Sequence, residues 1–296
     1  MLEALTTLIP EGIPVAVGLA ALAGAVLITG IAKSGFGGGV GILAVPLVAV
    51  ALDAQLAVGV MLPILLAADL VAVAQHRRDR SAPHLRWALI GGVLGIAVGT
   101  TLLGYFTIQE AAPPIATAAD PGSINSAAAL APATASAAAG QSLATALNLT
   151  VGGVCLLLVG LQLYRMFGGR VPRIPRHRAA GITAGGLAGF VSTLAHAAGP
   201  VMTVYILDQG LDKRRIVGTL VLYFFVINWF KVPTFLALGF ITPHTLSVSG
   251  LLILLVPLGS LLGLWLNRVI PEKPFTLVMY AGAGLAGVWL VVKGLR

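Results

Sequence analysis

The sequence predicts an all-α polytopic membrane protein, made of two inverted repeats of five segments each, with a short broken or re-entrant segment in each repeat. Three observations carry this prediction. The 296-residue chain is 58% hydrophobic and only 9% charged, whereas a soluble domain carries about a quarter charged residues. Its apolar runs have the length of about 20 residues that crosses a bilayer. Glycine-rich breaks recur at matching places in the two halves.

The same composition excludes several classes of protein. A soluble enzyme or a disordered chain would need more charge, and the single cysteine, Cys155, permits neither an internal disulfide nor a cysteine metal cluster. The runs do not alternate with a period of two, which excludes a β-barrel. The sequence contains no P-loop, no H-E-x-x-H and no G-x-S-x-G motif. We therefore expect no enzyme activity, no cofactor and no ATP-driven transport by this chain alone.

Ten apolar segments follow one another along the chain, and two of them are too short to cross a bilayer. Residues 1–12 hold no Lys or Arg and are expected to be a tail, not a cleavable signal peptide. The first repeat, 13–164, contains the segments 13–32, 42–52, 54–75, 87–106 and 143–164. A basic linker, 165–178, leads to the second repeat, 179–296, with the segments 179–198, 199–211, 216–240, 246–267 and 275–293.

A nearly constant shift aligns identical or similar residues of the two halves. The aligned pairs are Gly30 with Gly189 and Asp69 with Asn228 at a shift of 159, Gly99 with Gly259 at 160, and Gly153 with Gly287 at 134. The change of shift places an insertion in the first copy, within the loop 107–142. This loop is rich in Ala, Pro, Ser and Thr and is expected to be a linker outside the cytoplasm.

Basic residues predict the orientation in the membrane. By the positive-inside rule their loops are cytoplasmic, so both termini are expected outside the cytoplasm, in a cell (inner) membrane protein whose repeats run in opposite senses. Topology thus explains the net charge of +8, and nucleic acid is not an expected partner. The marking residues are Arg77, Arg78, Arg80 and Arg86, then Arg165, Arg170, Arg173, Arg176 and Arg178, then Lys213, Arg214 and Arg215, and finally Arg268 and Lys273.

The paired breaks are the first candidate for a binding site. A helix that begins inside the bilayer presents unpaired backbone N–H groups and a positive dipole end, which together bind anions. Segments that begin near Gly39 and Gly199 would point these ends at a shared midplane site, where Gly37 and Gly38 let the backbone approach a ligand. The alternative is that small residues only permit close helix packing.

Ionisable residues at membrane depth are the second candidate, because they are costly there. Lys33 and Lys231 would attract an anion, or else extend to the membrane surface. Asp69 would pair with a lysine or carry a proton. His196 would couple protons to transport, since histidine titrates near neutral pH, or would serve packing alone. Other residues predicted to line the site are Ser34, Ser192, Asn228 and Trp229.

Local signals predict further features outside the site. Asp53 and Asp212 match each other in the repeat alignment and are expected to cap helices. Trp87 lies near a segment end, as expected of a residue that anchors a helix at the membrane interface. The three prolines within apolar segments, Pro63, Pro233 and Pro257, are expected to kink their helices.

The stretch Gly30-Ile-Ala-Lys-Ser-Gly-Phe-Gly-Gly-Gly39, followed by Val45-Pro46, resembles the opening of the TauE/SafE sulfite-exporter family of anion permeases. Residues 52–59 and 211–218 are similar to motifs of its two repeats, whereas 194–200 depart from its Gly-rich pattern. The resemblance implies secondary transport of small anions, including sulfite, sulfonates and other organosulfur compounds, across a bacterial inner membrane.

Together these features predict a secondary transporter of sulfite, a sulfonate or another organosulfur anion, working by alternating access, with proton coupling through Asp69 or His196. Its partners would be the small anion and the lipid bilayer, and a homodimer is compatible with the many apolar helices. Three alternatives stay open: a passive anion channel, a cation-coupled or cation-selective carrier that uses Asp69, and a membrane enzyme or assembly subunit.

Overall fold

The computed structural model describes residues 14–38, 54–76, 79–111, 174–196 and 198–295, with single positions at 44, 48, 52, 149, 153, 156, 157, 159, 160, 163 and 164. Every element in this part of the chain is a helix. The predicted segments 42–52 and 143–164, apart from those positions, lie outside the described residues, as do Gly39 and Asp53. The helices are α2 (Val15–Phe36), α4 (Ala54–His76), α5 (Ala82–Ala111), α7 (Arg178–Ala195), α8 (Gly199–Leu207), α9 (Lys213–Ala237), α10 (Pro243–Ile253), α11 (Val256–Val269) and α12 (Glu272–Leu295).

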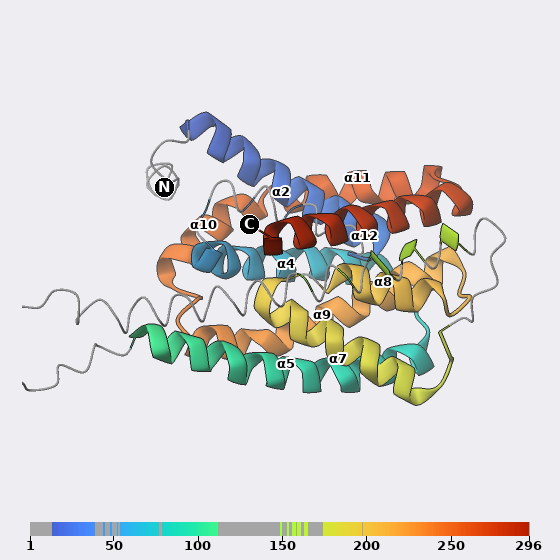
Figure 1. Ribbon diagram of the computed structural model, residues 1–296. Helices are drawn as coiled ribbons and strands as arrows, with labels where there is room; N and C mark the ends of the chain where they lie inside the picture. The colour runs from blue at the N-terminus through green and yellow to red at the C-terminus, as the bar shows by residue number, and fades with distance from the viewer. Residues whose placement is uncertain are drawn as a thin grey trace, which may run out of the picture.

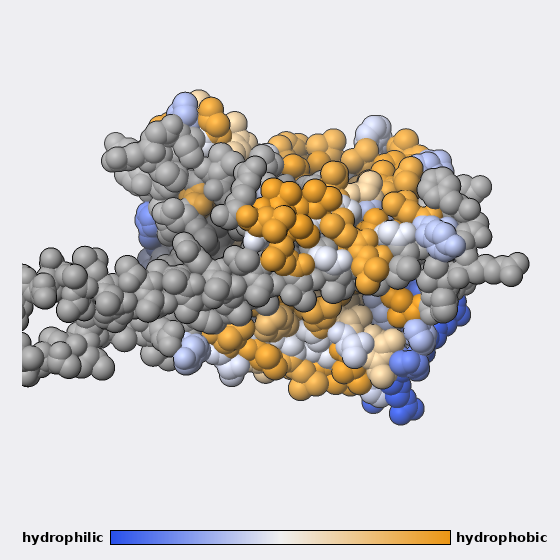
Figure 2. Space-filling view, viewed as in Figure 1, coloured by the Kyte–Doolittle hydropathy of each residue, from blue (hydrophilic) through white to orange (hydrophobic). Residues whose placement is uncertain are grey.

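Four helices are long and apolar enough to cross a membrane, and a bent pair makes a fifth candidate. The four spans lie in α2, α4, α5 and α9, and the bent pair is α10 with α11. The long helices run in a common direction (Figure 1), and hydrophobic residues cover much of the visible surface between the two ends of the molecule (Figure 2). The predicted all-helical, multi-pass membrane protein is therefore confirmed.

The predicted segment 246–267 is not one straight helix. It divides into α10 and α11, whose axes differ by 47°. Pro257 lies in the first turn of α11, where its missing N–H is tolerated, whereas within a continuous helix it would remove a hydrogen bond. The expected kink at Pro257 is therefore present. Pro63 and Pro233 lie inside α4 and α9 and end neither helix.

Two pairs of helices pack closely through glycine. In one pair α5 lies along α7, and in the other α2 lies along α11. A Cβ added at Gly35 of α2 would lie 2.6 Å from the carbonyl oxygen of Gly263 in α11, and a Cβ at Gly95 of α5 would clash with the carbonyl oxygen of Gly186 in α7. Small residues let helix backbones approach in this way, so the packing role considered for glycine holds at these positions.

The first break begins later than the predicted segment 13–32 suggests, and the second begins before the end of the predicted segment 179–198. Lys33, Ser34 and Gly35 form the last turn of α2 and not the break itself. The helix ends after Phe36, because Gly37, whose φ of 63° is left-handed, caps it and the N–H of Gly38 donates back to the carbonyl oxygen of Ala32 at 2.7 Å. At the second break α7 ends at Ala195, and α8 begins only four residues later.

The structure also shows where the inserted loop begins and confirms one predicted helix cap. Helix α5 continues to Ala111, so the first five residues of the range 107–142 extend the helix, and the rest of that range lies outside the described residues. Asp212 caps α9 as expected, because its carboxylate accepts from the N–H of Arg215 at 2.8 Å.

Candidate functional site

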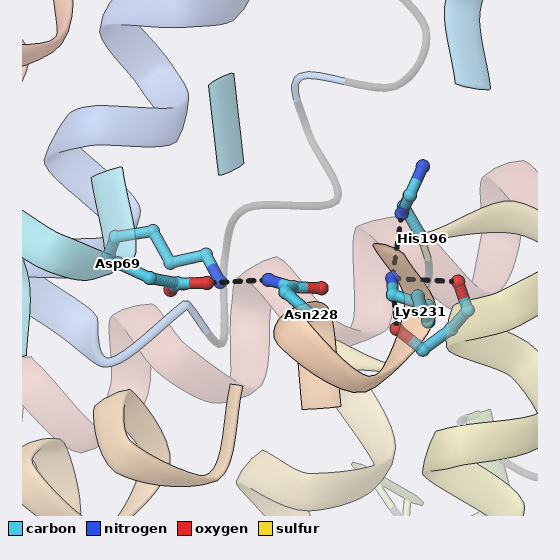
Figure 3. Close-up of polar contacts among 6 residues, drawn as sticks. Asp69, His196, Asn228 and Lys231 are labelled. Carbon is cyan, nitrogen blue, oxygen red and sulfur yellow. Dashed lines mark hydrogen bonds and ion pairs between the residues drawn. The ribbon is translucent and has the colours of Figure 1, made fainter. Parts of the chain in front are cut away.

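The first polar cluster joins three helices at the centre of the bundle. Lys33 Nζ of α2 lies 2.6 Å from Asp69 Oδ1 of α4, and Asn228 Nδ2 of α9 donates to Asp69 Oδ2 at 2.5 Å (Figure 3). All three residues are buried. The Lys33 ammonium also lies 4.7 Å from the centre of the Phe224 ring. Lys33 therefore does not extend to the membrane surface, and its charge is neutralised by Asp69.

The geometry of this cluster satisfies a carboxylate that would otherwise be very costly. A buried charge without a partner costs several kcal/mol. Asp69 has one oxygen on Lys33 and the other on Asn228, which is the arrangement that offsets desolvation best. The predicted pairing of Asp69 with a lysine is therefore present.

The second polar cluster surrounds Lys231, which is fully buried on α9. Its ammonium donates to the carbonyl oxygen of Ser192 at 3.2 Å and to Ser192 Oγ at 3.0 Å, and lies 3.0 Å from His196 Nδ1 (Figure 3). When Lys231 is charged, Nδ1 accepts and the imidazole proton resides on Nε2. No carboxylate of a described residue forms an ion pair with Lys231. Unlike the first cluster, this one therefore contains a basic group and no acidic group among the described residues.

His196 is held at Lys231 by its own backbone. Its φ of 51° is left-handed, and it is the single non-glycine residue with a positive φ in the described part of the chain. Its N–H donates to Ser192 O at 3.1 Å and closes the end of α7. A side chain in this conformation costs about 1–2 kcal/mol. The imidazole thus occupies a turn that glycine would make more easily, as Gly37 does at the end of α2.

A small cavity lies between the two clusters. Its volume is about 40 Å³, several times the ~10–15 Å³ that one water requires. The predicted site residues in its wall come from both breaks and from α9: Lys33, Gly38, Ser192, His196, Gly199 and Asn228. The prediction that the breaks meet at one place is therefore supported by the geometry.

The beginning of α8 faces this cavity through Gly199. Ala198 precedes the helix and provides no side-chain cap, and Pro200 stands in the first turn. The first-turn N–H groups of a helix have no intrahelical acceptors, and they carry the positive end of its dipole. The wall of the cavity thus contains Gly199 at the start of α8 together with Ser192 and His196, the two side chains that contact Lys231.

Four of the predicted residues are not in the wall of this cavity. Trp229 does not line the cavity: its side chain is 47% exposed and packs against Phe225, because adjacent helix residues point about 100° apart and Asn228 faces inward. Ser34, Gly37 and Lys231 are buried, but none of them is in its wall; Lys231 reaches the wall only through its partners Ser192 and His196. Gly39 lies outside the described residues.

Two sets of residues were missed by reasoning from the sequence. Phe224 and Phe235 lie four residues from Asn228 and Lys231, so a helical spacing could have found them; Phe235 packs 5.8 Å from the His196 ring, centre to centre. His76 Nε2 lies 2.8 Å from Ser34 O, and Asn267 Nδ2 donates to Gly35 O at 2.5 Å. Nothing local in the sequence pairs these distant residues.

The comparison with known families agrees with the fold and with the motifs at the breaks. The family model described as Sulfite exporter TauE/SafE matches residues 22–119 and 121–290, nearly the whole chain. No curated protein and no solved structure matches it. The matched residues include both polar clusters and both breaks. The chain therefore belongs to the TauE/SafE sulfite exporter family of membrane transporters.

Proposed function

We propose that this protein is a secondary transporter of a small organosulfur anion or sulfite, and that the anion binds beside Lys231. The observation that carries the proposal is a fully buried lysine whose described partners are a hydroxyl, a carbonyl and an imidazole. A buried charge with no counter-charge is costly. An anion in the adjacent cavity would supply that counter-charge.

The charges nearest the cavity favour a monoanion. Lys33 and Asp69 neutralise each other, which leaves the charge of Lys231. A sulfonate or hydrogensulfite carries one negative charge and would make the region neutral. Its oxygen atoms could accept from Lys231, from Ser192 Oγ and from the first N–H groups of α8. The Asp69 carboxylate is paired with Lys33, and the carbonyl oxygen of Ser192 accepts from Lys231. These contacts weaken the repulsion between those oxygen atoms and the anion.

His196 provides a route for proton coupling. Histidine changes its charge near neutral pH, and a second positive charge on the imidazole, whose Nδ1 lies 3.0 Å from the Lys231 ammonium, would be unfavourable without an anion beside the pair. Proton uptake by His196 would therefore favour the state in which the anion is bound. Asp69 is less suited to this role and to binding a cation, because both of its oxygens already have partners.

The inverted repeats that the sequence predicts would permit alternating access. The shift of about 160 residues that aligns the two halves equates α5 with α11 and α2 with α7. Both α5–α7 and α2–α11 are pairs of helices in contact, as this correspondence requires. Asp69 and Asn228, which the alignment equates, contact each other, as residues on a two-fold axis do. Helix α2 begins and α12 ends on the side opposite the basic loops (Figure 1), which favours termini outside the cytoplasm of an inner membrane protein. Rocking of such repeats about a central site is a common transport mechanism.

Uptake into proteoliposomes tests the proposal. The parent should take up labelled sulfite or a small sulfonate with saturation, whereas a passive channel would not saturate in the same range. Lys231→Met should reduce uptake more than tenfold, the order expected when a charged hydrogen bond to a ligand is lost. Trp229→Leu, on the same helix but facing outward, should transport like the parent. If Lys231→Met also does so, the assigned site is wrong.

A further inference from the structure

A second, larger cavity lies at the basic end of the molecule. Its volume is about 580 Å³, and its wall contains His84, Trp87, Arg176, His177, Arg178 and Tyr205. None of these residues lines the central cavity. Hydrophilic surface gathers at the lower right in Figure 2, the end at which α7 begins in Figure 1. By the positive-inside rule this end faces the cytoplasm.

The wall of this cavity is positively charged and contains no acidic residue. Arg176 and Arg178 are exposed, and no carboxylate among the described residues pairs with either of them. His84 and His177 add two imidazoles. Paired guanidinium groups bind phosphate oxygens through several N–H donors. The cavity is therefore suited to a phosphate group.

Trp87 holds one of these arginines in the wall. The guanidinium carbon of Arg178 lies 5.0 Å from the centre of the Trp87 ring, and that of Arg86 lies 5.2 Å from it. Such cation–π contacts restrict a long side chain. Tryptophan is also enriched at the level of the lipid headgroups, and Trp87 lies in the second turn of α5. The cavity thus lies at the depth of lipid phosphates.

An apolar groove lies next to the basic cavity. It has a volume of about 200 Å³ and shares Tyr205 with the basic cavity. Its wall includes Ala180, Ala184 and Leu187, whose spacing of four and three residues places them on one face of α7. These residues cover about 10 Å of helix length, directed away from the basic end. The groove is suited to a hydrocarbon chain.

We propose that these two adjacent cavities, which share Tyr205 in their walls, bind one anionic phospholipid, with its phosphate between Arg176 and Arg178 and an acyl chain along α7. Basic pockets between transmembrane helices on the cytoplasmic side bind such headgroups. A soluble phosphate compound would use the basic cavity but would gain nothing from the groove. The site is separate from the proposed anion site and does not depend on it.

Binding of lipids to the full-length protein in detergent tests this proposal. We expect phosphatidylglycerol to bind about tenfold or more tightly than phosphatidylcholine, and the double variant Arg176→Gln/Arg178→Gln to weaken it by about tenfold. The control Arg214→Gln/Arg215→Gln removes the same charge from the same side, outside both cavities, and should bind like the parent. Equal losses in the two double variants would mean general attraction to positive charge and would overturn the proposal.

The groove is tested separately from the charge. Thr183→Phe, at an exposed groove position, should obstruct the acyl chain and weaken phosphatidylglycerol binding, while Val98→Phe, exposed on α5, should not. Glycerol 3-phosphate should fail to compete at concentrations at which the lipid saturates. If it competes fully and Thr183→Phe has no effect, the ligand is a soluble phosphate, and the lipid proposal is wrong. Each variant should keep the parent's melting temperature without lipid.

Discussion

The two polar clusters occupy similar places at the ends of α2 and α7 but differ in charge. At the first break a lysine is paired with an aspartate, and at the second a lysine contacts only uncharged acceptors among the described residues. Both breaks nevertheless contain a left-handed residue, Gly37 or His196, at positions that the shift of 159 aligns. The comparison teaches that the backbone turn is common to both halves, whereas the charges are not. We propose that the first cluster serves to hold helices together and that the second serves to bind the ligand.

The largest expected effect is on the first cluster. Asp69→Ala leaves Lys33 charged and buried, which should lower the free energy of unfolding by about 3–5 kcal/mol. Thermal unfolding of the detergent-solubilised protein measures this loss. The double variant Lys33→Met/Asp69→Leu removes both charges and should recover most of the stability. If Asp69→Ala is as stable as the parent, the Asp69 carboxylate is not what neutralises the buried charge of Lys33.

The second cluster should respond to ligand instead. At a concentration of 100 times its dissociation constant, a bound sulfonate or sulfite should stabilise the parent by about 2.7 kcal/mol. Lys231→Met should lose this stabilisation while keeping the ligand-free melting temperature near that of the parent, since it removes a buried charge and leaves no carboxylate unpaired. The same thermal measurement, with and without anion, compares the two. Ligand stabilisation that persists in Lys231→Met would place the anion elsewhere.

The glycine contacts should be equally necessary in both halves. Gly35→Ala and Gly95→Ala each place a Cβ against a neighbouring carbonyl and should cost about 1–3 kcal/mol, as overpacking does. Gly250→Ala in α10 is the control, because an added Cβ there meets nothing within 4 Å, and alanine favours the helix by up to ~1 kcal/mol. If only one of the first two variants is destabilised, the packing of the two pairs is not equivalent.

The smallest effect on stability is expected at His196. His196→Gly relieves the left-handed conformation and loses the contact with Lys231, and these changes of about 1 kcal/mol each largely cancel. Transport by this variant should lose its dependence on pH between about 6 and 8, the range over which histidine changes charge. Uptake rates across that range provide the measurement. An unchanged pH profile would assign the coupling to another group.

Local signals in the sequence predicted much of the fold. The low charge and long apolar runs identified the membrane class, and helices such as α4 and α9 begin and end within about three residues of their predicted segments. Gly and Pro marked both breaks and the bend at Pro257. These features depend on properties of neighbouring residues, namely the hydrophobicity of a run, the missing N–H of proline and the freedom of glycine. The sequence alone therefore determined that the protein is a helical membrane protein with two breaks, and it identified the few ionisable residues within apolar segments.

Only the tertiary structure decided which of those residues meet. Lys33 and Lys231 look alike in the sequence, and either could bind an anion or pair with Asp69. Because α2 packs against α4, Lys33 lies beside the carboxylate of Asp69. The position of α7 brings Ser192 and His196 into contact with Lys231. Trp229 turns outward although its neighbour Asn228 is buried. The physical reason is that a partner depends on how each helix is rotated about its axis and which helix lies beside it, and these are set by contacts between residues far apart in the chain.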